Sequence, residues 1–313
     1  MIKSRIILGL ALLVGLMMMT GCGQKTPDSL PIENGQSEYP VIFQDDLGRQ
    51  VTIDSEPQRI VSLSPSNTEI LYAIGLNSRM AGVTTYCDYP AAARQCKKIG
   101  GFSDPNLEMI IALNPDLVVA ESIHSLVIPA LEEAGIPVLA VEPQRLADIS
   151  GAVELIGRAT GRQAEANRLA EEIRDKIEQV RSRIIGDSNP PLVYFEIWHE
   201  PFMTVGPGTL IDDLITVCGG INLAGDAAGH YPELSEEAII LRNPDVIIYP
   251  ESHGEALINP MNRTGAWQTV KAVQSGRVTA INPDIVNRAG PRVIQAMDEL
   301  LRIIHPELGL RGE

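Results

Sequence analysis

Short apolar runs and amphipathic stretches alternate along most of this chain. Runs typical of buried strands fall at residues 59–65, 80–84, 117–120 and 138–141. Helical spacing of apolar residues separates them, at residues 66–75, 107–113 and 127–134. Strands that alternate with short helices are typical of α/β proteins, because each helix carries the chain back to start a parallel neighbour. The pattern therefore predicts a mostly parallel α/β sheet.

Two local signals add detail to the start of this region. Val41 to Phe43 and Val51 to Ile53 flank the turn residues Asp45 to Gly48, which predicts a β-hairpin. Ser66 stands three residues before Glu69, the spacing of a capping box in which each side chain bonds the other's backbone N–H. We therefore expect a helix to begin at Ser66.

Residues 147–185 contain no proline and show helical periodicity with one interruption at Thr160-Gly161. The part after the interruption carries an apolar stripe at Leu169, Ile173, Ile177 and Val180, with charged residues between. A helix of this length is stiff enough to join two domains. The strand–helix alternation then restarts with Leu192 to Ile197.

An internal repeat links the two halves of the chain. The segment 107–119 aligns with 236–248 through an Asn-Pro-Asp turn in each, and the alignment places Glu108 opposite Glu237. Acidic residues favour the first turn of any helix because of the helix dipole. The helix dipole can explain either glutamate alone, but it explains less well why both halves carry a glutamate at the same position of the repeat. The repeat predicts two similar α/β lobes, each with one such glutamate.

The N-terminus has the layout of a signal peptide. Lys3 and Arg5 precede an apolar stretch, Ile6 to Met19, that is short for a membrane span. Thr20-Gly21-Cys22 follows and resembles a lipobox, which implies lipidation of Cys22. The next residues are polar and rich in proline and glycine, as in a disordered tether. We divide the chain into a signal peptide (1–21), lipidated cysteine and tether (22–40), N-terminal lobe (41–146), interdomain helix (147–186) and C-terminal lobe (187–313).

The charge balance excludes several partners. The chain has 25 Lys and Arg against 40 Asp and Glu, a formal charge of −15. Nucleic acids and anionic membranes both require clustered cations, so neither is an expected partner. No second apolar run approaches the ~20 residues of a membrane span. The expected location is the extracytoplasmic face of the cell membrane, through the lipid anchor alone, in a monoderm or a diderm envelope.

Three cysteines remain after Cys22. Cys87 and Cys96 lie in a loop-like stretch, where an oxidising compartment would allow a local disulfide. Two free thiols are the alternative, and the sequence leaves both open. Cys218 lies in an apolar run and is expected to be a buried, unreactive thiol.

Several motifs together resemble one family. They are the segment Arg59 to Glu69, the two Asn-Pro-Asp turns, and Asn287-Arg288-Ala289-Gly290-Pro291-Arg292. In order and spacing they resemble the binding proteins of ABC importers for cobalamin, iron-siderophores and haem. The resemblance implies two similar α/β lobes joined by one long rigid helix, with the ligand cleft between them. It also implies a monomer that meets an ABC permease dimer and its ATPase subunits, with Glu108 and Glu237 docking onto permease arginines.

The residues most similar to the cobalamin-binding branch are Thr85 to Pro90, Gly100 to Phe102 and Glu196 to Gly206. A corrin is a flat, partly apolar ring fringed with amides, so aromatic faces and a few polar groups suit it. Glu121 departs from the branch, because a well-known member has tryptophan there. The resemblance implies these ligand contacts: Tyr86, Phe102, Trp198, His199, Phe202, Tyr231 and Arg288.

Other ligands and functions stay open at this point. Arg288 and Arg292 would allow an anionic ferric siderophore or haem in the same fold, and His199 or His230 could meet the ligand's metal. We expect no metal site of the protein's own, since no two histidines have i, i+4 spacing, and no resident cofactor. A secreted hydrolase is a distant alternative, because the chain has no Gly-x-Ser-x-Gly nucleophile motif. We expect a binding protein and not an enzyme.

Overall fold

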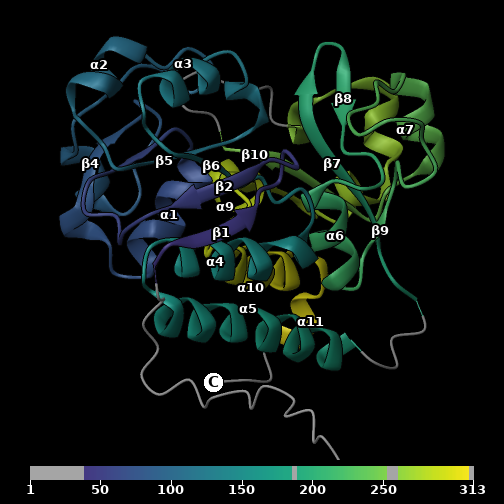
Figure 1. Cartoon of the computed structure of the whole chain (residues 1–313). Helices are drawn as coiled ribbons and strands as arrows, with labels where there is room; N and C mark the ends of the chain where they lie inside the picture. Colours follow the sequence, from purple (N-terminus) through teal and green to yellow (C-terminus); the bar gives the residue numbers. More distant parts are fainter. Residues whose placement is uncertain (1–38, 185–188, 252–259, 310–313) are drawn as a thin grey trace, which may run out of the picture. The chain divides into compact units, whose positions relative to one another are not determined.

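The computed structural model describes residues 39–184, 189–251 and 260–309 (Figure 1). The expected signal peptide, Cys22 and the tether as far as residue 38 lie outside the described residues. Within the described ranges, no helix combines the length and the apolar character needed to cross a membrane.

The N-terminal lobe is built on a parallel sheet with strand order β4-β3-β5-β6. Its central strands are buried on both faces, as expected for a parallel sheet covered by helices. A separate antiparallel pair, β1 and β2, confirms the predicted hairpin. The strands are β1 Val41–Gln44, β2 Gln50–Ile53, β3 Ile60–Ser62, β4 Met80–Val83, β5 Leu117–Ala120 and β6 Val138–Ala140.

The C-terminal lobe has a second sheet of order β11-β10-β7-β8, with β9 paired to β7. All its pairings are parallel except β7–β8, which forms a hairpin. The prediction of two α/β lobes with mostly parallel sheets is therefore confirmed. The strands are β7 Leu192–His199, β8 Phe202–Thr204, β9 Ile221–Asn222, β10 Val246–Pro250 and β11 Val278–Ile281.

Helices connect and cover the two sheets (Figure 1). In the first lobe they are α1 Pro65–Ala73, α2 Leu107–Ala112 and α3 Ile128–Glu133, and the segment between the lobes forms α4 Ile149–Ala159 and α5 Gln163–Ile184. In the second lobe they are α6 Leu210–Val217, α7 Glu236–Arg242, α8 Lys271–Gln274, α9 Pro283–Asn287, α10 Val293–Ile304 and α11 Pro306–Gly309.

The predicted interruption at Thr160-Gly161 separates α4 from α5. Gly161 has a φ of +70°, a left-handed conformation that ends helices readily because glycine has no Cβ to clash. The chain reverses there, so α4 and α5 pack along each other. The long helix α5 also contacts α6 and α10 of the second lobe, and Lys176 on α5 lies 2.5 Å from Asp298 on α10. One helix thus touches both lobes.

The internal repeat is visible in the backbone. Asn114 and Asn243, the first residues of the two Asn-Pro-Asp turns, have φ values of +45° and +53°. Asparagine tolerates this left-handed region better than other residues with a side chain. Asp116 accepts the backbone N–H of Arg59, next to β3, and Asp245 accepts that of Leu192, at the start of β7. The same turn therefore ties the same strand in each lobe.

One capping prediction is wrong. Ser64, not Ser66, caps α1 by accepting the N–H of Asn67, because the helix begins one residue earlier than expected, at Pro65. Glu69 does not cap the helix. Its carboxylate is buried and bonds two arginines of the other lobe.

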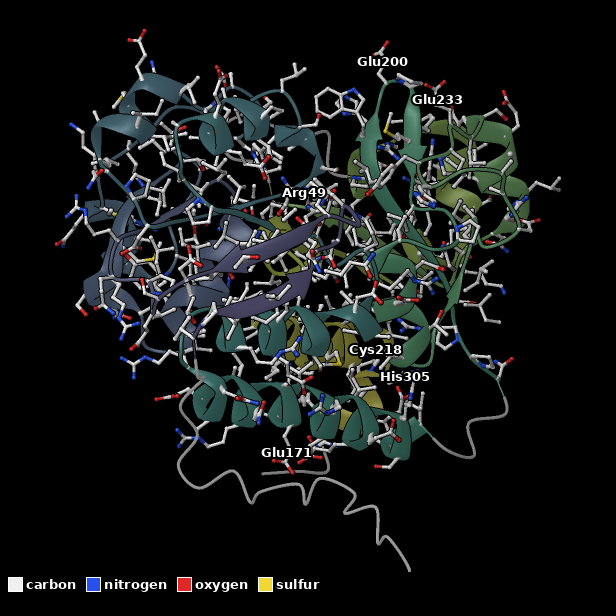
Figure 2. The ribbon with its side chains drawn as sticks, viewed as in Figure 1. Arg49, Glu171, Glu200, Cys218, Glu233 and His305 are labelled. Atoms are coloured by element: carbon white, nitrogen blue, oxygen red, sulfur yellow. The ribbon has the colours of Figure 1, made fainter. Side chains whose placement is uncertain are left out.

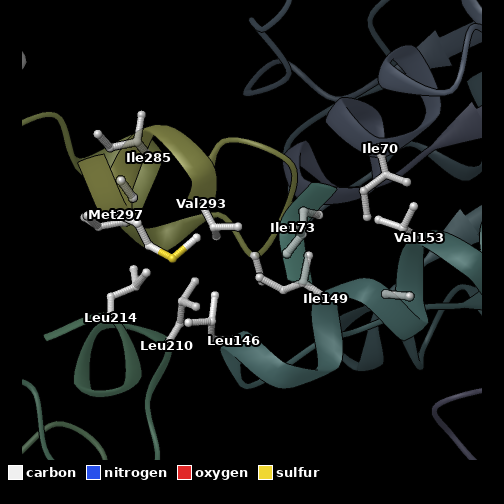
Figure 3. Close-up of a cluster of buried hydrophobic side chains, with 14 of the residues drawn as sticks. Ile70, Leu146, Ile149, Val153, Ile173, Leu210, Leu214, Ile285, Val293 and Met297 are labelled. Carbon is white, nitrogen blue, oxygen red and sulfur yellow. The ribbon is translucent and has the colours of Figure 1, made fainter. Parts of the chain in front are cut away.

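A single hydrophobic cluster runs through the contact between the lobes (Figure 3). It joins Ile70 of α1 and Ile149 of α4 to Leu214 of α6 and Met297 of α10. Lobes that share a large apolar core do not move freely as separate bodies. We therefore expect them to unfold together.

Met297→Ala should lower the free energy of unfolding by about 2–5 kcal/mol, because it removes a fully buried side chain and leaves a cavity. Urea unfolding followed by circular dichroism measures the loss. Leu241→Ala, at a side chain 85% exposed, is the matched control and should stay within about 0.5 kcal/mol. Two separate transitions in calorimetry would contradict the shared core.

Candidate functional site

Polar side chains gather where the parallel strands of the first lobe end. Ser64 follows β3, Glu121 follows β5 and Glu142 lies two residues beyond β6. Because parallel strands end at the same edge, these three residues meet there, and ligands of open α/β sheets bind at this edge. Glu121 interacts with both neighbours: it hydrogen-bonds the Ser64 side chain and feels the charge of Glu142.

Two adjoining hollows lie above this edge. One, of about 400 Å³, is lined by residues including Tyr86, Phe102 and Arg288. The other, of about 180 Å³, is lined by Glu142, His230 and Tyr231 among others. They share three lining residues, Ser66, Glu121 and Asn287. Both lobes therefore contribute to one cleft, of the size class of small-molecule sites.

Tyr86 and Phe102 reach the cleft from loops of the first lobe. Thr85 N–H donates to the Gly100 carbonyl at 2.9 Å, which ties the two loops together. The Phe102 ring meets the His124 ring edge-on at 5.4 Å. His124 Nδ1 accepts the Glu121 N–H, so its Nε2 carries the proton that it donates to the Phe102 carbonyl. Burial lowers the pKa of His124, which suits this neutral form.

Tyr231 reaches the cleft from the second lobe. Gly206 N–H donates to the His230 carbonyl at 2.7 Å, which holds the two segments together. A Cβ at Gly206 would lie 2.1 Å from the Gly229 carbonyl oxygen, so only glycine allows this approach. Tyr86 and Tyr231 are 62% and 60% exposed, and each belongs to a different lobe. Two large exposed aromatic side chains in one cleft are a surface for a ligand.

The arginines expected near the cleft are already paired. Arg292 bonds Glu69 through Nε and Nη2, at 2.8 and 2.6 Å, and lies over the Tyr89 ring. Arg288 lies within 3.0 Å of carboxylate oxygens of Glu69, Asp88 and Asp284. Burial alone would raise the pKa of Asp88, but the hydrogen bond and the charge of Arg288, together with a backbone hydrogen bond and the charge of Arg94, lower it overall. Arg288 lines the cleft, but its positive charge is offset by three carboxylates.

Glu121 has the most perturbed carboxyl group of the cleft. Burial raises its pKa to about 7, the Ser64 hydrogen bond opposes this rise, and the nearby charge of Glu142 adds to it. Sequence reasoning noted Glu121 only as a departure from a family pattern. Its position directly after a fully buried strand was the signal that could have placed it in the site.

The remaining predicted contacts do not line the two hollows. Trp198 and His199 lie at the end of β7, and the Trp198 indole N–H donates to the carbonyl of Glu200 at the hairpin tip (Figure 2). Phe202 packs against the buried Trp267, and Arg263 stacks over both rings. Phe202 therefore has a packing role. Trp267 is 2% exposed and serves packing as well.

Cys87 and Cys96 are free thiols, so the disulfide alternative is not the one observed. Cys87 Sγ points into the core and lies 3.1 Å from the hydroxyl oxygens of Thr68 and Thr84. Cys96 Sγ instead donates to the Met80 carbonyl. Cys218 is buried among packed side chains as expected (Figure 2), and burial raises the pKa of its thiol to about 12.

The two repeat glutamates occupy the same helix position. Glu108 is the second residue of α2 after the capping Asn106, and Glu237 is the second residue of α7 after the capping Ser235. Both side chains are exposed. Hydrogen bonds from its own backbone N–H and from Ser235 lower the pKa of Glu237, so it is ionised at neutral pH.

Two α/β lobes, a connecting helix and an aromatic cleft between the lobes define a two-lobed solute-binding protein. The sequence profile of the periplasmic binding protein family matches residues 60–285, and the chain belongs to this family. The resemblance inferred from the motifs is thereby confirmed.

Individual relatives agree with this assignment. The chain is 32% identical to the uncharacterized ABC transporter substrate-binding lipoprotein YvrC of Bacillus subtilis (strain 168), over 97% of this chain and 98% of that protein. It is 31% identical to a cobalamin-binding protein of Halobacterium salinarum (strain ATCC 29341 / DSM 671 / R1), over 85% and 74%. A solved structure from Staphylococcus epidermidis, described as a possible iron-binding periplasmic solute-binding protein, matches with a TM-score of 0.71 at 28% identity, over 80% and 100%.

These relatives are substrate-binding transport proteins and not enzymes. The fold, the two-lobe arrangement and the class of substrate-binding protein were all expected from the sequence.

Proposed function

We propose that this protein is a lipid-anchored extracytoplasmic binding protein that captures cobalamin or a related corrinoid and delivers it to an ABC permease. The observation that carries the proposal is the composition of the cleft. Two exposed tyrosines, Tyr86 and Tyr231, face the hollows from opposite lobes. Aromatic faces of this kind suit a flat, partly apolar ring.

The charges of the cleft support an uncharged, amide-rich ligand. Among the described residues that line the two hollows, Arg288 is the sole arginine or lysine, and carboxylates offset its charge. The carboxyl groups of Glu121 and Glu142 add no positive charge. An anionic chelate would lose its hydration here without gaining a counter-ion. The amides of a corrinoid can instead bond Ser66, Asn287 and the carboxyl groups.

A ferric siderophore or haem is the second candidate. The structural similarity to the S. epidermidis protein, described as a possible iron-binding protein, favours it. His230 at the cleft is a potential contact for the metal of such a ligand. The neutralised arginines make this candidate weaker than a corrinoid.

The proposal also assigns residues to permease docking and to the lipid anchor. Glu108 and Glu237 would meet two permease subunits, one from each lobe. An exposed apolar residue follows each glutamate on the same helix, Ile111 on α2 and Leu241 on α7, and offers contact area beside the charge. Cys22 would carry the lipid, as the name of the B. subtilis lipoprotein suggests for that relative.

Titration calorimetry of the detergent-extracted full chain tests the ligand. Cyanocobalamin should bind, and a ferric siderophore and hemin should bind at least about tenfold more weakly. Tyr86→Ala and Tyr231→Ala should each weaken cyanocobalamin binding by roughly tenfold, since each removes an aromatic face. Tyr249→Ala, at a tyrosine that does not line either hollow, is the control. Tight siderophore binding without corrinoid binding would refute the proposed ligand.

A further inference from the structure

Glu121 is the one ionisable carboxyl group that lines both hollows of the cleft, among the residues the structure describes. It stands at the carboxyl end of β5, next to the buried Ser64, and its backbone carbonyl accepts the N–H of His124 at 3.0 Å. The backbone of Glu121 is held by His124 through this bond and the one from its own N–H to Nδ1, and the Ser64 side chain bonds its carboxyl group, so the side chain is positioned at the cleft. Whatever fills the cleft therefore meets this carboxyl group.

The groups around Glu121 offer it no effective positive charge. Glu142 is acidic, and one of its oxygens already accepts the Ser122 N–H at 2.8 Å. His124 has its Nε2 proton engaged by the Phe102 carbonyl, and burial favours its neutral form.

The residues that face Glu121 from other elements also offer it no unpaired positive charge. Arg288 is paired with Glu69, Asp88 and Asp284. Tyr86, Tyr231 and His230 also face the cleft. A ligand that covers the cleft would remove water from Glu121 as well. Loss of water disfavours the charged form of a carboxyl group, so binding favours its protonated form.

We propose that Glu121 is a specificity-determining residue that acts as a neutral carboxylic acid, donating a hydrogen bond to an amide carbonyl of the ligand, so that capture is linked to uptake of one proton. The proton comes from solvent and returns to it on release. This inference rests on the proposed function, because it deepens the account of the same cleft. Its consequence is that the protein binds more tightly in acidic than in alkaline surroundings.

The expected pH dependence follows from the fraction of protein with Glu121 protonated. If only that form binds, the apparent affinity falls in proportion to it. With a pKa of about 7, cyanocobalamin affinity should fall at least about tenfold between pH 5.5 and 9.0. At pH 7 binding should take up roughly half a proton, measured by calorimetry in buffers of different ionisation enthalpy.

Three variants separate this role from a structural one. E121Q keeps a donor at every pH, so its affinity should stay within about twofold of its own value from pH 5.5 to 9.0. E121A has no donor and should bind weakly throughout. E142Q removes a neighbouring negative charge, so the fall in affinity should begin at a lower pH than in the wild type.

A measurement without ligand checks the titration itself. A raised carboxyl pKa in the folded state means that this group's contribution to stability falls as pH rises toward 7 and then levels off. The Tm of E121Q relative to the wild type should therefore increase between pH 5 and pH 8. A constant difference would overturn the inference.

The outcomes with ligand are distinct. Loss of pH dependence in E121Q alone supports the inference. Equal pH dependence in E121Q and the wild type overturns it and leaves the proposed function standing. Absence of cyanocobalamin binding even at pH 5.5 overturns the proposed function, and the inference with it.

Discussion

Replacing Glu108 and Glu237 together by alanine should abolish cobalamin uptake by cells while the purified protein binds its ligand as before. Both glutamates lie at the same position of equivalent helices, one on each lobe. Neither lines the cleft hollows, so ligand affinity has no reason to change. Exposed ion pairs contribute about 1 kcal/mol or less each, but complementary charges set the orientation and rate of encounter. Uptake of labelled cobalamin measures the loss.

Each single alanine variant should retain part of the cobalamin uptake, because the lobe that keeps its glutamate would still dock onto its permease subunit. Charge reversal to lysine should be more severe than alanine, since like charges would then face each other. The matched control is Glu133→Ala with Glu236→Ala, two exposed glutamates of which Glu236 precedes Glu237 on α7. Normal uptake by the Glu108/Glu237 double variant would rule out their docking role.

Much of the fold could be predicted because its signals are local. The strands β5 and β10 are short apolar runs, and the Asn-Pro-Asp turns before them require a left-handed residue that asparagine supplies. The break between α4 and α5 was visible as Thr160-Gly161. Periodicity and turn chemistry act over a few residues, so a single sequence contains them.

The site was less predictable because it depends on distant partners. Glu69 bonds Arg288 across 219 positions of the chain, and no spacing rule connects them. Its spacing from Ser66 suggested a local cap, and tertiary pairing overrode that signal. Phe202 was expected at the ligand but packs on Trp267, since aromatic residues serve cores as readily as clefts. Tyr86 and Tyr231 were correctly placed at one cleft, although their role in binding stays a prediction.

Glu69→Ala should be strongly destabilising and lower the free energy of unfolding by about 3–5 kcal/mol. Glu69 is 2% exposed and bonds Arg292, which is 7% exposed. Removing one partner of a buried ion pair leaves the other charge without compensation, which costs far more than the pair itself contributes. Urea unfolding at pH 7 measures the change, with the slope m expected to stay constant.

Glu56→Ala is the matched control, because Glu56 pairs with Arg79 at 2.6 Å but is 42% exposed. Solvent screens that pair, so its loss should cost about 1 kcal/mol or less. Glu69→Gln tests the role of the charge in ligand selectivity, since it keeps the size of the side chain and removes its charge. Arg288 would then keep Asp88 and Asp284 but lose one of its three carboxylates, and this less negative cluster should raise affinity for the anionic hemin relative to cyanocobalamin. Unchanged relative affinity would show that Glu69 is not what keeps anionic ligands out.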